Sequence, residues 1–303
     1  MLEKLKWDLV IEYDGASLEE TFDASRVTAA GSEALEISHE RRVKLRRSDV
    51  RPHILSDLKL LRGVGSITEG MLKSEGYHTI EDLLEHETYR EEAARILGLI
   101  EAGDFPEIRG YLNCSSSDYR VLGALGLVDE ERFTFLDIET LGLGGAPVIL
   151  TGMAWIEDGV INVRQRLAPA PEMEGAVLEI YHHIPPDSII VTFNGASFDL
   201  PYIRRRSAVH GLENRLENCH VDLYHISRRL WGHRLPDCKL STVERHILGA
   251  ERDLDIPGSH VPDYYRTYLS TGSPGPLVPL VEHNRDDIIN MALLIPHVTS
   301  GTC

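Results

Sequence analysis

The sequence of 303 residues lacks the features of a secreted or membrane-embedded protein. Its four cysteines are Cys114, Cys219, Cys238 and Cys303. None of them belongs to a Cys-x-x-Cys pair, which argues against a disulfide framework and against a conventional zinc site. The longest apolar run, residues 146–156, is too short to cross a bilayer and contains Pro147. Because the first residues also lack the apolar core of a signal peptide, we expect a cytoplasmic protein without a membrane partner.

Positive charge is scarce as well. The chain has 31 lysines and arginines against 48 aspartates and glutamates, for a net charge of −17, which excludes a protein with a basic surface throughout. Nucleic-acid binding is still open, because it needs only a local basic patch. Residues 41–51 hold six basic side chains and one acidic one, and form either a solvated strand or loop or a phosphate-contacting patch. Residues 203–252 hold ten basic and six acidic side chains, interleaved with aromatics.

The apolar pattern predicts three parts, residues 1–53, 54–130 and 131–298. The first part has no clear period and no role that we can assign, although residues 9–13 read as a strand. The second part is helical, since its apolar residues recur three and four apart. We expect the third part to be an α/β domain with a mixed sheet flanked by helices, preceded by the small helical region. Its strands are expected over 133–138, 148–155, 160–167 and 188–193, the middle two forming a hairpin around 157–159.

Two glycines mark a turn in the helical part. Residues 60–73 read as the end of a helix, the turn Gly63-Val64-Gly65 and a second helix. This pattern resembles a helix-hairpin-helix motif, and the resemblance implies that backbone amides near Gly63 and Gly65 contact the phosphates of a duplex. Arg62 and Lys73 flank the turn. The alternatives are a purely structural helical hairpin and a protein-docking module.

Three segments of the third part carry carboxylates that an apolar framework would not favour. Asp137 and Glu139 are two apart at the end of a strand, so both project from the same face. Two acids so close repel each other, and a hard divalent cation is the simplest partner for both. Asp199 opens a helix, and His283 and Asp287 stand four apart on another helix and share a face. Each segment alone also has an ordinary explanation, as a solvated strand edge, a helix cap or a surface ion pair.

The three segments together are more specific than each alone. Asp-Ile-Glu-Thr from residue 137, Phe-Asn-x-x-x-Phe-Asp-x-Pro-Tyr from residue 193 and His-x-x-x-Asp from residue 283 follow one another in order. This set resembles that of the DEDD exonucleases, which have a ribonuclease H-like fold. The second segment resembles the proofreading exonuclease of B-family DNA polymerases. Residues 131–298 also resemble the stand-alone YprB-type family, and residues 228–246 and 255–263 support that narrower match.

The resemblance implies a metal site and a residue that handles the attacking water. Two Mg²⁺ or Mn²⁺ ions would be held by Asp137, Glu139, Asp199 and Asp287, with the first of these bridging them. His283 would position or deprotonate the water. It departs from the family pattern, since the family has Tyr-x-x-x-Asp or His-x-x-x-x-Asp and this chain has histidine at the tyrosine spacing. Asp286 is the neighbouring alternative to Asp287, but it would point elsewhere.

The implied activity is that of a 3′–5′ exonuclease on single-stranded nucleic acid, with DNA favoured over RNA, acting alone or in a repair complex. The alternatives are a structure-selective endonuclease on the same site and an inactive nucleic-acid-binding adaptor. The residues expected to contact nucleic acid are Thr140, Leu141, Asn194, Phe198, Arg204, Arg228, Arg229, Arg234, Gly63 and Gly65. Asp222 reads equally well as a structural cap. The spacing of Cys219, His220, His225 and Cys238 is too irregular to favour a zinc site.

Overall fold

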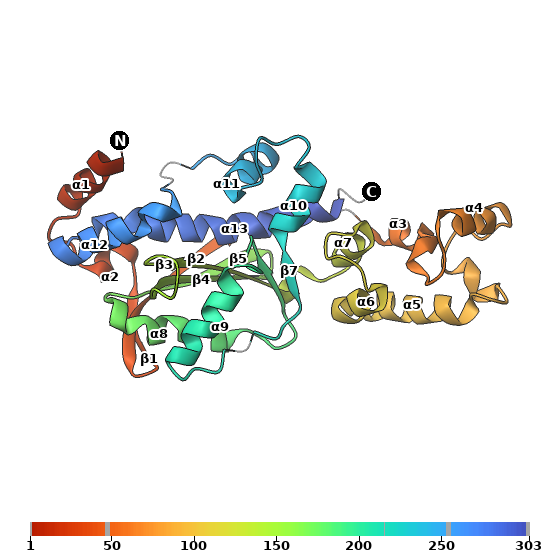
Figure 1. Cartoon of the computed structure of the whole chain (residues 1–303), viewed down its shortest axis with the longest axis horizontal. Helices are drawn as coiled ribbons and strands as arrows, with labels where there is room; N and C mark the ends of the chain where they lie inside the picture. Colours follow the sequence, from red (N-terminus) through yellow and green to blue (C-terminus); the bar gives the residue numbers. More distant parts are fainter. Residues whose placement is uncertain (1, 46–48, 215, 253–255, 301–303) are drawn as a thin grey trace. The chain divides into compact units, whose positions relative to one another are not determined.

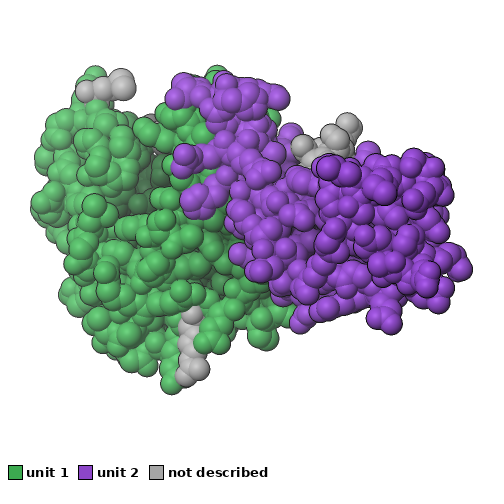
Figure 2. Space-filling model, turned by 45° about the vertical axis from the view of Figure 1, so that its right-hand side comes forward, with its two compact units in different colours: residues 1–44, 131–224, 237–293 green, residues 45–130, 225–236, 294–303 purple. Residues whose placement is uncertain are grey.

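The computed structural model describes residues 2–45, 49–214, 216–252 and 256–300 (Figure 1). They form two compact units, which are coloured separately in Figure 2. Unit 1 contains residues 1–44, 131–224 and 237–293, and unit 2 contains residues 45–130, 225–236 and 294–303. Arg46 and Arg47 of the basic cluster, and Arg215 and Asp255, lie outside the described residues. No helix in the described ranges is long and apolar enough to cross a membrane.

Unit 1 is built on a seven-stranded mixed sheet in the order β1-β2-β5-β4-β3-β6-β7. The strands β1 to β5 pair antiparallel, and β6 and β7 join parallel to β3 and to each other. Their bounds are β1 Ser25–Ala29, β2 Ser32–Arg42, β3 Phe133–Thr140, β4 Val148–Glu157, β5 Val160–Leu167, β6 Ile189–Thr192 and β7 His220–Asp222. The first two strands therefore extend the sheet with residues from the N-terminal part of the chain.

The hairpin expected around residues 157–159 joins β4 to β5. Asp158 and Gly159 both have positive φ angles, 49° and 71°, the backbone geometry that lets a two-residue turn match the twist of its strands. The register pairs Glu157 with Val160 and continues to Leu150 opposite Leu167. The expected hairpin and the mixed sheet flanked by helices are thus confirmed.

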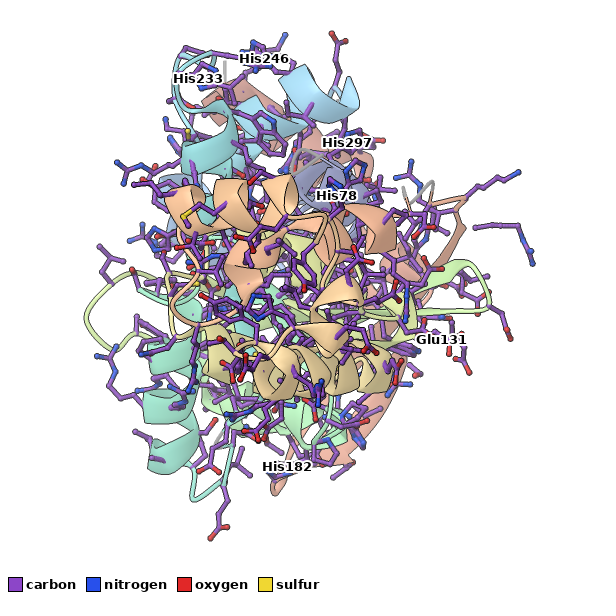
Figure 3. All side chains as sticks on the ribbon, turned by 90° about the vertical axis from the view of Figure 1, so that its right-hand side faces the viewer. His78, Glu131, His182, His233, His246 and His297 are labelled. Carbon is purple, nitrogen blue, oxygen red and sulfur yellow. The ribbon has the colours of Figure 1, made fainter. Side chains whose placement is uncertain are left out.

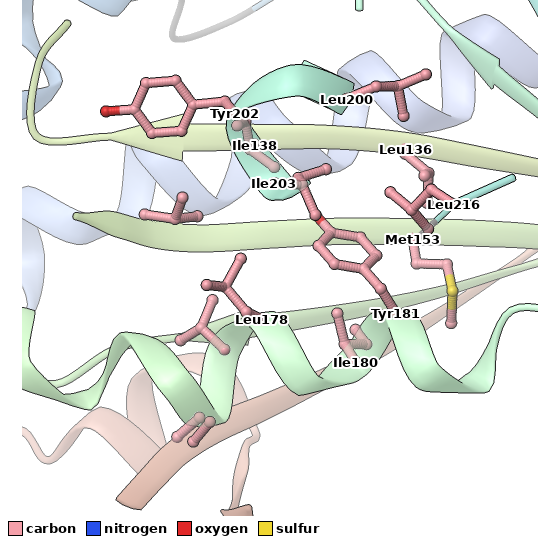
Figure 4. Close-up of a cluster of buried hydrophobic side chains, with 14 of the residues drawn as sticks. Leu136, Ile138, Met153, Leu178, Ile180, Tyr181, Leu200, Tyr202, Ile203 and Leu216 are labelled. Atoms are coloured by element: carbon pink, nitrogen blue, oxygen red, sulfur yellow. The ribbon is translucent and has the colours of Figure 1, made fainter. Parts of the chain in front are cut away.

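Helices cover both faces of the sheet (Figure 1). One face packs against α8 Glu174–Leu178, the 3-10 helix η5 Glu179–His183 and α9 Asp199–Val209. Figure 4 shows this core, in which Leu136 and Ile138 of β3 meet Tyr181 and Ile203. The other face packs against α1 Leu2–Glu12, α12 Val261–Thr271 and residues 278–293 of α13 Val278–Ser300. Shorter helices in this unit are α2 Leu18–Phe22, α11 Leu240–Val243 and the π-helical turn Glu244–Leu248.

The strand expected over residues 9–13 is wrong, because this segment ends helix α1. Leu9 and Ile11 alternate in the way of a strand, but Ile11 is 75% exposed. The apolar residues that pack are Leu2, Leu5 and Leu9, spaced three and four apart on one helical face. Lys6 reinforces the docking, since its Nζ donates to Asp263 of α12 at 2.5 Å. Tertiary packing of one face decides the structure of this short segment.

Unit 2 is helical, as the spacing of its apolar residues predicts. Its helices are α3 Arg51–Ser56, η1 Leu58–Leu60, α4 Ser66–Ser74, η2 Asp82–Glu85, α5 Arg90–Ala102, α6 Phe105–Leu112 and α7 Tyr119–Leu125. Gly63 has a φ of +82°, which favours glycine, and Gly65 caps the N-terminus of α4. The helical element directly before these glycines is the short 3-10 helix η1. α10 Leu223–Trp231 begins in unit 1 and continues in unit 2.

Candidate active site

Strand β3 presents Asp137 and Glu139 on the face of the sheet opposite α8 and α9. Leu136 and Ile138 point into the core under those helices, so the two acids between and after them point to the other side. The register with β4 shifts between Glu139 and Thr140, as in a β-bulge. The expected sharing of a face by the two carboxylates follows directly from the alternation of the strand.

The segment after β6 brings Asp199 to the same place. Asp222, at the end of β7, accepts the backbone N–H of Asn194 at 2.7 Å and that of Ala196 at 3.1 Å, and so holds the turn. Asp222 therefore acts as a structural cap. Asp199 is the first residue of α9, and its carboxylate accepts a hydrogen bond from the backbone of Ile138 in β3. This hydrogen bond ties the second acidic segment to the first.

Helix α13 supplies His283, Asn284 and Asp287. The Nε2 atom of His283 lies 3.6 Å from Oδ2 of Asp287 and 3.9 Å from Oε1 of Glu139. The fully buried Asn284 donates its Nδ2 proton to Oδ2 of Asp137 at 2.7 Å. Asp286, by contrast, is 40% exposed and has its Oδ1 atom 3.7 Å from Nε of Arg285. The geometry thus favours Asp287 over Asp286 as the candidate metal ligand from α13.

Burial and mutual repulsion perturb these carboxyl groups. Burial raises the pKa of Asp137 well above its ordinary value, and the charges of Asp287, Asp199 and Glu139 add to the rise. Burial also raises the pKa of Glu139 to about 7, an effect that the nearby His283 opposes. For Asp199 burial likewise raises the pKa to about 7, against hydrogen bonds that lower it. Several carboxylates in one desolvated place are costly when ionised, and a divalent cation would compensate them.

Arg252 occupies part of this site. Its guanidinium group donates to Glu244, Asp287 and Nδ1 of His283. Across the described ranges, no three His, Cys, Asp or Glu side chains stand in an arrangement that could hold a metal ion. The donor set still fits a hard cation in kind, because it consists of four carboxylates that repel one another.

Several residues of the site were not found by the spacing of acidic residues. Gln165 of β5 donates from Nε2 to Oδ1 of Asn284 at 2.7 Å, which fixes the orientation of the asparagine amide. Gly152 of β4 lies beside it, and a Cβ atom there would stand 2.3 Å from Oδ1 of Asn284. Arg252 and Glu244 were also missed as parts of the site. Gln165 is fully buried although it stands between Arg164 and Arg166 in β5, so no local pattern of the sequence marked it.

The residues of unit 1 that were expected to contact nucleic acid differ in their exposure and in their contacts within the protein. Thr140 donates its hydroxyl to the carbonyl of Gly142 at 3.0 Å, and the partly buried Leu141 packs against the core. Phe198 packs on Tyr202, with ring centroids 5.1 Å apart. Arg204 donates to the carbonyl oxygen of Leu216 at 2.7 Å. Asn194 is exposed, with a φ of +66°. Their contact with a strand stays a prediction.

Unit 2 holds the other expected contacts. Arg228 and Arg229 of α10 line a cavity of about 600 Å³ together with Ser115, Ser116, Ser117 and His225. Arg234 is exposed and donates from Nε to the ring of His233 at 2.8 Å. Gly63 and Gly65 line a separate cavity of about 380 Å³ beside Arg62, whose guanidinium stacks on Tyr111.

Four of the histidines labelled in Figure 3 illustrate how this residue is distributed. His78, His182, His233 and His246 come from four different segments (Figure 3). In the group considered for zinc, His220 is already engaged, because its Nε2 atom lies 2.8 Å from the Thr192 hydroxyl. The arrangement gives no support to a zinc site at these residues.

Comparison with known proteins agrees with these features. Residues 134–299 match the family model described as the RNase_H superfamily. The chain is 32% identical over 209 residues to the uncharacterized protein YprB of Bacillus subtilis, an alignment that covers 67% of this chain and 50% of that protein. It is 28% identical over 144 residues to a DNA polymerase of Methanocaldococcus jannaschii, covering 39% of this chain and 9% of the polymerase. The chain therefore spans about half the length of the first relative and much less of the second.

Among solved structures, the family B DNA polymerase of the archaeon Pyrobaculum calidifontis aligns with a TM-score of 0.44 at 21% identity. That alignment covers 54% of this chain and 24% of the polymerase chain. The family match and the two curated relatives, rather than this alignment, confirm the expected resemblance to YprB-type proteins and to B-family DNA polymerases, and with it the ribonuclease H-like fold.

Proposed function

Because the chain belongs to the RNase H superfamily, we propose that it is a metal-dependent nuclease that shortens single-stranded nucleic acid from the 3′ end, with DNA favoured. The observation that best supports this proposal is that Glu139 and Asp287 both lie within 4 Å of His283, while burial and the charges of Asp287, Asp199 and Glu139 raise the pKa of Asp137. The raised pKa values of three of them support it, since a buried acidic cluster needs positive charge to stay ionised.

These four carboxylates, Asp137 among them, would hold two Mg²⁺ or Mn²⁺ ions. When bound, the ions stabilise negative charge on the phosphodiester and lower the pKa of a bound water. The chain's own contribution is to orient the carboxylates. Asn284 holds one oxygen of Asp137, and the Ile138 backbone holds Asp199. The Nε2 atom of His283 lies 3.9 Å from Oε1 of Glu139, so the imidazole would be within reach of a water near that carboxylate.

Arg228 and Arg229 support a second element of the proposal, a phosphate-contacting surface in unit 2. Both arginines are exposed, and the cavity beside them is lined by three serine residues. Guanidinium groups pair with phosphate oxygens through parallel hydrogen bonds, and serine hydroxyl or amide groups add further donors. We assign this surface to the sugar–phosphate backbone rather than to bases.

The direction of attack is tested with a DNA oligonucleotide labelled at the 5′ end. The purified protein with Mg²⁺ or Mn²⁺ should give a ladder of products that shorten one nucleotide at a time. A blocked 3′ end should stop the reaction. Internal cleavage of the blocked oligonucleotide would instead identify an endonuclease on the same carboxylates.

A further inference from the structure

Arg252 joins two side chains of α13, His283 and Asp287, to Glu244 of the π-helical turn. Its Nη1 atom lies 2.9 Å from Nδ1 of His283, and its Nη2 atom donates to Oδ1 of Asp287. On its other side, Nε and Nη2 donate to Glu244 at 2.9 Å and 2.6 Å. The arginine side chain is only 8% exposed and that of Glu244 only 1%. The guanidinium is therefore held in one position by a buried carboxylate.

The chemistry of the partners fixes the direction of the hydrogen bond to His283. A guanidinium group has only donors, no acceptor, and stays protonated in proteins. Nδ1 of His283 must therefore be the acceptor of the bond from Arg252 and carries no proton. In a neutral imidazole the proton then resides on Nε2. Nε2 is the ring nitrogen that faces Asp287 at 3.6 Å and Glu139 at 3.9 Å.

We propose that Arg252, held by Glu244, is a positioning residue that fixes His283 in the tautomer protonated at Nε2, so that His283 acts as a hydrogen-bond donor in the site and not as the general base. This assignment rests on the proposed function for its place in the reaction. The donor would contact the oxygen of the attacking water or a phosphate oxygen, and the proton released by that water would pass to solvent. A general base needs a free lone pair at the nitrogen that faces the water, and Arg252 places that lone pair on the opposite side of the ring.

The backbone around Glu244 supports a dedicated role for this pair. Glu244 begins a π-helical turn, Glu244–Leu248, which ends at Gly249 with a φ of +66°. Such turns are rare and occur often at functional sites, where they redirect a side chain. Asn290 of α13 also hydrogen-bonds to Glu244. The turn thus delivers a buried carboxylate to the arginine that faces the candidate active site.

Nitrogen-15 NMR of the metal-free protein labelled at histidine tests the tautomer directly. The His283 signals, assigned by their loss in His283→Gln, should show a protonated Nε2 and an unprotonated Nδ1. Arg252→Met should remove this preference and give a mixture of tautomers, whereas Arg252→Lys keeps a donor and should retain it. Arg245→Met is the control, because Arg245 directly follows Glu244 on the π-helical turn but is exposed. A wild-type His283 protonated at Nδ1, or no change in Arg252→Met, would overturn the proposal.

A second arm tests the role in the reaction and separates it from the proposed function. Glutamine places an N–H donor near the position of Nε2 but takes no proton at neutral pH. His283→Gln should therefore stay within about tenfold of the wild-type rate, while His283→Ala should lose about a hundredfold, as for removal of a catalytic donor. Equal losses in both variants contradict the donor role. If the wild type cleaves no nucleic acid, the proposed function fails, and the NMR result still decides the tautomer.

Discussion

Asn284 and Asp137 are joined by a hydrogen bond of 2.7 Å although 147 positions of sequence separate them. The asparagine lies on α13 and the aspartate on β3, so the bond fixes the helix to the strand at the candidate active site. Gln165 fixes the amide from the other side, donating to it at 2.7 Å and to the carbonyl of Val281 at 2.9 Å. Asp137 is therefore oriented by a chain of buried amides.

Removing this amide should impair both the site and the fold. In Asn284→Ala, Gln165 and Asp137 lose a buried partner, which should cost about 1–3 kcal/mol of the free energy of unfolding. The nuclease rate should fall at least tenfold, since a misplaced carboxylate holds metal less well. Urea unfolding and rate measurements check both. Asn162→Ala is the control, because Asn162 lies on β5 and its side chain donates to the nearby carbonyl of Val160. If Asn284→Ala matches this control in stability and rate, the Asn284 amide does not orient Asp137 for the reaction.

Gly152 should tolerate no side chain. It pairs with Asp137 across β3 and β4, and a Cβ atom would stand 2.3 Å from Oδ1 of Asn284. Gly152→Ala should therefore displace the asparagine and lower the thermal midpoint together with the nuclease rate. Gly98→Ala is the matched control, because Gly98 lies within α5 and has open space around it. That change should be neutral or stabilise the protein by up to about 1 kcal/mol.

The raised pKa values give the metal-free protein a specific pH dependence. With a pKa of about 7 for Glu139 and Asp199, the folded protein binds more protons than the unfolded chain between about pH 4 and 7. The free energy of unfolding should therefore fall as pH rises through this window. Thermal unfolding in a chelator should show a lower midpoint at pH 8 than at pH 5.5. Saturating Mn²⁺ should reduce this decline.

Asp199→Asn gives the control for that titration, because it removes one of the two groups. The decline of the midpoint with pH should be smaller in this variant than in the wild type. A wild-type protein whose metal-free stability rises between pH 5.5 and pH 8 would show that these carboxyl groups do not dominate the pH response.

The cavity beside Arg228 and Arg229 predicts a salt-dependent contribution to binding. Arg228→Ala and Arg229→Ala should each weaken the binding of a single-stranded oligonucleotide to a cleavage-deficient Asp137→Asn protein. Each should also lower the slope of log affinity against log salt by about 0.7, the value for one phosphate contact on a single strand. Fluorescence anisotropy measures both quantities.

The control is Arg266→Ala, because Arg266 is an exposed arginine on α12 and its variant should bind like the parent protein. Equal binding by all three variants would remove the Arg228 and Arg229 surface from the proposal.

The sequence predicted the fold best where a local pattern controls the structure. Alternation in β3 placed Asp137 and Glu139 on one face, and a spacing of four placed His283 beside Asp287 on α13. Residues 9–13 were misread because their alternation was outweighed by the packing of Leu2, Leu5 and Leu9 on one helical face.

The rest of the site depends on contacts between distant segments. Arg252 reaches His283 across 31 positions, and Asn284 reaches Asp137 across 147. No local period encodes such contacts, and an arginine in a basic stretch reads as a surface residue. Arg204 donates in the structure to a backbone carbonyl, and its contact with nucleic acid stays a prediction.

The most direct test of the proposed nuclease site compares two neighbouring acids of α13. Asp287 faces His283 in the candidate active site, whereas the Asp286 side chain is 40% exposed and lies beside Arg285. With Mn²⁺ and a 5′-labelled oligonucleotide, Asp287→Asn should lose at least a hundredfold in cleavage rate, while Asp286→Asn should cleave like the wild type. Equal rates for the wild type and Asp287→Asn, or a loss confined to Asp286→Asn, would contradict a nuclease site built on these carboxylates.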